Sequence, residues 1–128
     1  MRLLLDTCAF LWIVGGGPEL SSRARDAFVD PANDVYLSSA SAWEIAVKHQ
    51  MGRLPLPEPP ASFVPRLREV HDIEVLPIDE ASALHVGNLP ALHRDPFDRM
   101  LVSQALVGGL TIVTPDHAIR QYPAPTLW

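Results

Sequence analysis

Cysteine is nearly absent from the sequence, and this scarcity narrows the classes of protein it can represent. Cys8 is the single cysteine among 128 residues. An intramolecular disulfide framework and a zinc site built from several cysteines are therefore both excluded. The first apolar run, Leu3–Leu5, meets Asp6 at once, which is too early for a signal peptide. No uncharged stretch reaches the ~20 apolar residues that span a bilayer. We therefore expect a cytoplasmic protein that does not enter a membrane.

Basic residues are also scarce. Lysine and arginine total 10 against 15 acidic residues, which gives a net charge of −5, and Lys48 is the only lysine. A protein that holds nucleic acid by bulk charge needs a basic surface, so that mode of binding is disfavoured. A local basic rim around an acidic site remains compatible with this composition.

The order of apolar runs predicts an α/β fold. Short apolar runs alternate with segments of helical periodicity, which is typical of a mainly parallel central sheet flanked by helices. The chain length fits one domain over residues 1–128. The sheet is expected to have four to five strands, at Arg2–Leu5, Val35–Ser38, Ile73–Leu76 and Thr111–Val113, with Thr126–Trp128 as the fifth. The expected helices cover about 7–14, 22–29, 40–51, 62–71, 79–88, 96–107 and 117–122.

Four acidic residues are positioned to meet at one edge of this sheet. Asp6 ends the first strand, and Asp116 lies three residues beyond the strand that ends at Val113. The carboxyl ends of parallel strands share one edge, where ligands bind. Asp98 and Glu44, each in the first turn of a predicted helix, can point to the same edge.

Such a cluster of carboxylates predicts a bound cation. Four neighbouring negative charges repel one another unless some are protonated or a cation lies among them. Oxygen ligands select hard cations, here Mg²⁺ or Mn²⁺. The chemistry that follows most directly is phosphodiester hydrolysis, in which the metal activates water and neutralises charge on the phosphate.

Each acid also has a purely structural interpretation. The catalytic interpretation is favoured because all four acids occur together, and no single acid carries it. Asp6 and Asp116 are suited to cap the helices that follow them. Glu44 is placed to pair with Lys48 at i,i+4. Asp98, in a first helical turn, complements the helix dipole.

Asp95 is the nearest competitor for a metal role. It precedes Pro96 at the first position of a helix, which predicts that Asp95 is the N-cap. We therefore assign Asp98 to the metal and keep Asp95 as an alternative ligand. The five histidines show no HExxH-type spacing, so a histidine ligand is not expected.

Further residues are predicted to assist the acids. Thr7 and Thr114 adjoin strand ends, and their hydroxyls can orient carboxylates. Arg94 and Arg99 flank the acidic pair and are candidates for binding substrate phosphates. Trp43, Phe97 and Met100, together with Cys8, are expected in the core.

Four segments place these acids in recurring local contexts: Leu3–Thr7, Ser38–Ala46, His93–Ala105 and Leu110–Asp116. In this order and spacing they resemble the motifs of PIN-domain ribonucleases, specifically VapC-type toxins of bacterial toxin–antitoxin pairs. The resemblance covers essentially the whole chain.

The resemblance implies a set of functional expectations. It implies a single PIN-like α/β domain with an acidic pocket that binds Mg²⁺ or Mn²⁺, formed by Asp6, Glu44, Asp98 and Asp116. Asp6 and Asp98 correspond to the usual direct ligands. It also implies cleavage of RNA that inhibits translation, homodimerisation, and neutralisation by a small cognate antitoxin protein.

Three other classes remain open. A dehalogenase-like phosphotransfer enzyme would use Asp6 as its nucleophile. Such an enzyme needs a second acid two residues later, and this sequence has Cys8 at that position. A receiver module needs a lysine late in the chain, whereas Lys48 is the only one. A catalytically dead PIN-fold binding protein would keep the fold without the activity.

Overall fold

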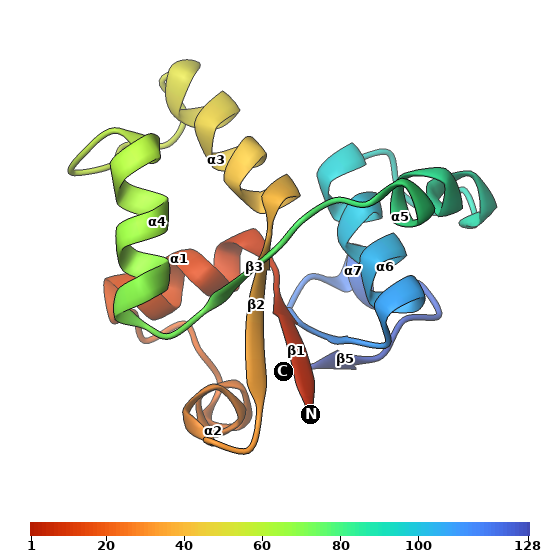
Figure 1. The fold of residues 1–128 in the computed structure, drawn as a ribbon, viewed down its shortest axis with the longest axis horizontal. Coiled ribbons are helices and arrows are strands. Elements are labelled where there is room, and N and C mark those ends of the chain that lie inside the picture. The colour runs from red at the N-terminus through yellow and green to blue at the C-terminus, as the bar shows by residue number, and fades with distance from the viewer.

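Five short strands form one parallel sheet in the computed structural model, which describes all 128 residues (Figure 1). The strand order is β3-β2-β1-β4-β5, and every neighbouring pair is parallel. This confirms the α/β class and settles the number of strands at five. The strands are β1 (Arg2–Leu5), β2 (Asp34–Ser38), β3 (Glu74–Leu76), β4 (Thr111–Val113) and β5 (Thr126–Leu127).

The strand order creates a switch point beside the central strand. From β1 the chain moves outward through β2 and β3, and it then returns to the other side of β1 for β4 and β5. Ligands of open parallel sheets bind at such a point, beyond the carboxyl ends of the strands. Leu5 pairs with Leu37 of β2 and with Val113 of β4. The next residues along β1 and β4, Asp6 and Thr114, therefore lie side by side at the carboxyl edge.

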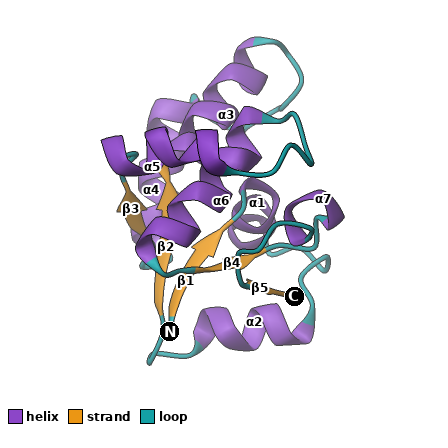
Figure 2. Ribbon diagram, turned by 90° about the vertical axis from the view of Figure 1, so that its right-hand side faces the viewer, coloured by secondary structure: helices purple, strands orange, loops and turns teal.

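Helices cover both faces of the sheet. In Figure 1, α1 and α4 lie on one side of the strands, and α5, α6 and α7 lie on the other. Figures 1 and 2 both show α2 near the amino ends of the strands and α3 at the opposite end. The helices are α1 (Thr7–Gly15), α2 (Ser22–Val29), α3 (Ser39–Gln50), α4 (Pro60–Val70), α5 (Glu80–His85), α6 (Pro96–Gly108) and α7 (His117–Arg120).

The alternation of side chains along β1 divides the core in two. Leu3 and Leu5 belong to a cluster that includes residues of α1, α3 and α4, whereas Leu4 packs against α6 on the other face. All three side chains are fully buried. Burial on both faces explains why β1 has a continuous apolar run and not an alternating pattern.

Local capping residues set most of the helix boundaries. Asp6, Asp95 and Asp116 each accept a hydrogen bond from a backbone N–H in the first turn of the following helix. Gly16 and Gly109 cap the C-terminal ends of α1 and α6, and their φ angles of 64° and 67° favour glycine. The sequence predicted the Asp95 cap and offered caps at Asp6 and Asp116 as alternative interpretations, and the structure contains all three.

Several details differ from the sequence-based expectations. The predicted 79–88 helix divides into α5 and a 3₁₀ turn at Val86–Asn88. α4 begins at Pro60, two residues before the predicted start at 62, and Pro65 lies inside the helix. None of the helices could cross a membrane, and the longest, α6, has 13 residues.

Two residues expected in the core are exposed. The buried residues of α3 are Ala40, Ser41, Glu44 and Ile45, and Trp43 lies outside this stripe with 57% of its surface exposed. Cys8 is exposed at the start of α1. The placement of Trp43 and Cys8 in the core was therefore wrong. Phe97 and Met100 are partly buried.

Candidate active site

Asp6 is the most deeply buried of the four acids. It follows β1 and caps α1, where its Oδ1 accepts a hydrogen bond of 2.7 Å from the backbone N–H of Ala9. The Thr114 hydroxyl donates to its other oxygen, Oδ2. Only 4% of the residue is exposed. Burial, as the largest cause, raises the pKa of Asp6 to about 6, although these two hydrogen bonds favour the charged form.

Thr114 connects Asp6 to the loop that carries Asp116. The hydroxyl of Thr114 donates to Asp6 and also accepts a 3.0 Å hydrogen bond from the backbone N–H of Asp116. Asp116 is exposed, and its Oδ1 accepts from the N–H of Ala118 as the N-cap of α7. Thr114 thus fixes the Asp6 carboxylate relative to the start of α7.

Glu44 projects from the buried side of α3, and both of its oxygens have partners. The Thr7 hydroxyl donates to Oε1 at 2.7 Å, and the Lys48 ammonium pairs with Oε2. The side chain of Glu44 is 7% exposed. The i,i+4 pair with Lys48 that the sequence suggested is present, and it joins a buried carboxylate to an ammonium group whose side chain is 41% exposed. The Glu44 hydrogen bond raises the pKa of Lys48.

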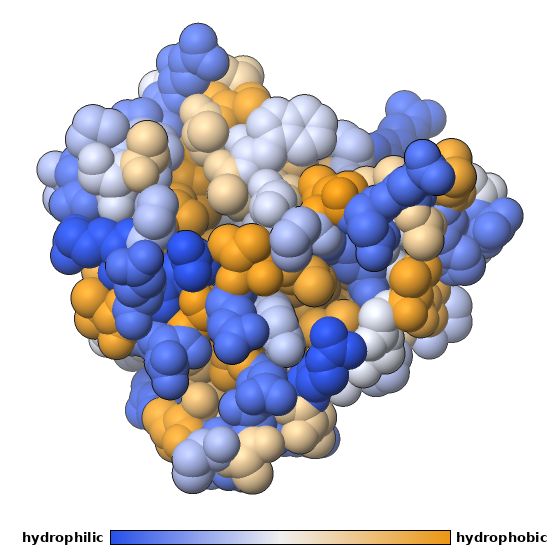
Figure 3. All heavy atoms as spheres, viewed as in Figure 1, coloured by the Kyte–Doolittle hydropathy of each residue, from blue (hydrophilic) through white to orange (hydrophobic).

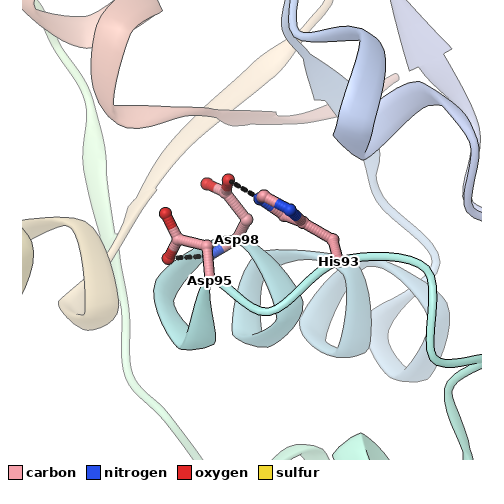
Figure 4. Close-up of side chains that lie close together, drawn as sticks. All are labelled: His93, Asp95 and Asp98. Carbon is pink, nitrogen blue, oxygen red and sulfur yellow. Dashed lines mark hydrogen bonds and ion pairs between the residues drawn. The ribbon is translucent and has the colours of Figure 1, made fainter.

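Asp98 lies in the first turn of α6 beside two other potential ligands (Figure 4). Its Oδ2 forms a 3.0 Å hydrogen bond with His93 Nε2. Asp95 Oδ1 caps the helix by accepting from the backbone N–H groups of Phe97 and Asp98. One ligand atom from each of His93, Asp95 and Asp98 lies within 4.8 Å of the others. Asp6 is not part of this compact set.

The acids influence one another although they come from four separate segments. Burial is the largest cause that raises the pKa of Asp98 to about 7, and the charge of Asp95 adds to it. The charges of Glu44 and Asp116 raise the pKa values of both Asp6 and Asp98. The structure therefore brings the four predicted acids into one electrostatic neighbourhood.

A divalent cation fits this neighbourhood on chemical grounds. Asp6 and Asp98 are largely buried carboxyls whose charged forms lack a matching lysine or arginine, and the only lysine already pairs with Glu44. Such groups are stabilised by a metal ion. Carboxylate oxygens are the donors that hard divalent cations prefer.

The two arginines predicted to bind phosphate differ in their surroundings. Arg99 donates to the carbonyl oxygens of Pro90 and Val86 and to the Tyr122 hydroxyl. These contacts hold the segment before α6 in place, so they favour a structural role for Arg99. Arg94 is exposed, which suits a contact with substrate.

His93 is a potential ligand that the sequence did not predict. The expectation of no histidine ligand came from the lack of HExxH spacing, but His93 reaches Asp98 from a loop and not from the same helix. The usable signal was its position two residues before Asp95, in the turn that leads into α6.

Comparison with known proteins places the chain in a family. The PIN-domain family model matches residues 3–125, and the chain belongs to this family. Two relatives are ribonucleases of Mycobacterium tuberculosis. VapC16 is 45% identical over 64 residues, which is 50% of this chain and 45% of VapC16. VapC22 is 28% identical over 130 residues, which is 98% of each protein.

Solved structures share the fold at lower identity. A VapBC2 complex from Rickettsia felis, bound to a DNA fragment from its promoter, contains a chain that is 16% identical, with a TM-score of 0.70 over 98% of this chain and 97% of that one. A DNA-bound VapBC complex from Salmonella typhimurium gives 20% identity and a TM-score of 0.69, over 98% and 96%. Membership of the PIN family leaves the dehalogenase-like and receiver interpretations without support.

Proposed function

We propose that this protein is a metal-dependent endoribonuclease and the toxin of a toxin–antitoxin pair. The observation that carries the proposal is that Asp6, Glu44, Asp98 and Asp116, from four segments of a PIN-family fold, influence one another electrostatically. The relatives named as ribonucleases support RNA as the substrate. An RNA substrate would place the protein in the cytoplasm.

The side chains divide into ligands and supports. Asp6 and Asp98 are the proposed direct ligands of Mg²⁺ or Mn²⁺, with Glu44, Asp116 and Asp95 completing the pocket. A bound ion would activate water and offset the charge that builds up on the phosphate. Thr114 and Thr7 hold Asp6 and Glu44 in fixed orientations.

The remaining hydrogen-bonding capacity indicates which oxygens are available. Asp6 and Glu44 have one partner on each carboxylate oxygen, so each of these oxygens keeps a second lone pair that can bind an ion. Asp98 Oδ1 and Asp116 Oδ2 have no side-chain or backbone partner in the structure. These free oxygens are positioned to bind the ion or to accept a proton from an attacking water. Arg94, on the rim, is the proposed contact for a substrate phosphate.

Two partner interactions belong to the same proposal. The structural relatives are VapBC complexes, and one of them, from Mycobacterium tuberculosis, is a member of the VapBC family of toxin–antitoxin systems. We propose that this chain likewise binds a small cognate antitoxin, forms a homodimer, and inhibits translation by cutting RNA. The expected genomic neighbour is a short upstream reading frame that encodes a protein with an N-terminal DNA-binding segment.

The decisive test compares the wild-type protein with Asp6→Asn. Purified protein is incubated with total bacterial RNA in Mg²⁺, Mn²⁺ or EDTA, and the cut ends are mapped. We expect discrete cuts with the wild type in divalent ion only, and none with Asp6→Asn. Growth arrest on expression in a bacterial host should follow the same pattern. Intact RNA in every condition would indicate a catalytically dead PIN-fold protein.

A further inference from the structure

An aromatic pair lies beside the acidic residues and has no assigned role. Trp43 of α3 and Phe97 of α6 meet edge to face, with ring centroids 4.8 Å apart and an interplanar angle of 75°. Trp43 is 57% exposed and is the only aromatic among the large exposed hydrophobic residues. The other two tryptophans, Trp12 and Trp128, are partly buried and pack against each other.

The pair is tied to the site by its sequence positions. Trp43 immediately precedes Glu44, and Phe97 immediately precedes Asp98. Adjacent residues on an α-helix point about 100° apart, since one turn takes about 3.6 residues. Each helix therefore directs an acid into the pocket and an aromatic ring to one side of it. The contact between the two rings shows that both aromatics lie on the same side, at the rim between α3 and α6.

We propose that Trp43, supported by Phe97, is a stacking platform for a nucleobase of the RNA strand next to the phosphate that is cut. This inference rests on the proposed nuclease function. An edge-to-face contact occupies part of each ring and leaves indole surface open to solvent, as the exposure of Trp43 shows. Aromatic side chains at the rim of nucleic-acid sites bind single strands by stacking, which tolerates any base.

The charge of the protein strengthens the case for stacking. With a net charge of −5, bulk attraction cannot supply the affinity for RNA. Stacking on an uncharged ring does not depend on a basic surface. The face shown in Figure 3 carries its hydrophobic residues in separate small groups among hydrophilic ones, and not as one broad apolar surface. Trp43 supplies the only aromatic ring among the large exposed hydrophobic residues, and one exposed indole offers a flat surface for one planar base.

Binding of a 12-nucleotide single-stranded RNA, followed by fluorescence anisotropy, tests the proposal. All proteins carry Asp6→Asn so that the strand is not cut. Trp43→Ala should weaken binding by about 5- to 150-fold, the equivalent of one stacked base. Trp43→Phe should recover most of the affinity. Met51→Ala is the matched control, because Met51 caps the same helix and is 59% exposed, and it should leave binding unchanged.

A second strand of equal length, with abasic sugars in place of the bases, isolates the role of the base. On this strand the parent protein and its Trp43→Ala variant should bind equally, because no base is left to stack. Equal binding of the 12-nucleotide RNA by Trp43→Ala and its parent, or an equal loss on the abasic strand, would overturn the proposal. So would a dimer that dissociates in Trp43→Ala while RNA affinity is kept, since Trp43 would then be an interface residue.

Cleavage assays with proteins that keep Asp6, run beside these binding measurements, separate this inference from the nuclease assignment. If the wild type binds RNA through Trp43 but cuts none in Mg²⁺ or Mn²⁺, the nuclease assignment fails and the stacking platform stands. If Trp43→Ala cuts RNA with unchanged KM and kcat, the nuclease assignment stands and the platform fails. Melting temperatures of the variants within a few degrees of the parent exclude misfolding as the cause.

Discussion

The Thr114 hydroxyl donates a hydrogen bond to the Asp6 carboxylate across 108 residues of sequence. This contact joins the residue after β4 to the residue after β1, on the two sides of the switch point. Because Thr114 also accepts from the N–H of Asp116, one hydroxyl positions two of the four acids. The geometry of the site therefore depends on this hydroxyl as well as on the acids.

Replacement of Thr114 by valine should damage the site while keeping its shape. The variant loses both hydrogen bonds of the hydroxyl, so Asp6 gains freedom and its charged form loses stabilisation. Residues that orient metal ligands typically contribute about 10- to 100-fold to activity or metal affinity. We expect a loss of RNA cleavage in that range, with Thr114→Ser close to the wild type. Full activity of Thr114→Val would show that the hydroxyl is dispensable.

Asp6→Asn and Asp98→Asn should abolish cleavage yet stabilise the metal-free protein. Each replaces a largely buried carboxyl, surrounded by like charges, by a neutral amide of similar shape. Asparagine at position 6 also retains the N-cap of α1. Thermal melts in EDTA provide the measurement, and a clear loss of stability in both variants would contradict the account.

Without divalent ions, the stability of the fold should decrease as pH rises from about 4 to about 7. The pKa values of Asp6 and Asp98 are raised from 3.8 to about 6 and about 7, so the folded state binds more protons than the unfolded chain in this range. Stability then falls with pH, by up to about 3 kcal/mol for Asp6 alone. Urea unfolding at several pH values measures the slope. Asp6→Asn should reduce it, and an unchanged slope in that variant would rule out Asp6 as a source.

His93→Ala should weaken metal binding. His93 contacts Asp98 Oδ2 and lies within the compact set of potential ligands. Loss of a ligand, or of a residue that orients one, lowers affinity by about 10- to 100-fold. Titration calorimetry with Mn²⁺ measures the change, and His85→Ala, on α5 and outside this set, is the control. Equal affinities for the wild type and both variants would remove His93 from the site.

Sequence predicted the parts of the fold that depend on neighbouring residues. Asp95 before Pro96 is a local capping signal, and the predicted N-cap is present. The apolar run before Asp6 likewise predicted a buried strand, because a strand covered on both faces needs apolar residues at every position. These features depend on neighbouring residues in the sequence and not on contacts with distant segments.

Contacts between distant segments could not be predicted in the same way. The role of Arg99 depends on Val86, Pro90 and Tyr122, which only the tertiary structure brings to it. Trp43 was expected in the core because large aromatic residues are usually buried. Its exposure follows from the orientation of α3, which the sequence around Trp43 leaves open.

The central claim is that Asp6 and Asp98 share one divalent ion, and crystals soaked in Mn²⁺ test it most directly. Anomalous scattering locates manganese independently of the protein atoms. The account predicts a single strong peak at the carboxyl edge of β1 and β4, bound by carboxylate oxygens of both residues. A peak held by His93, Asp95 and Asp98 without Asp6, or no peak near either residue, would contradict it.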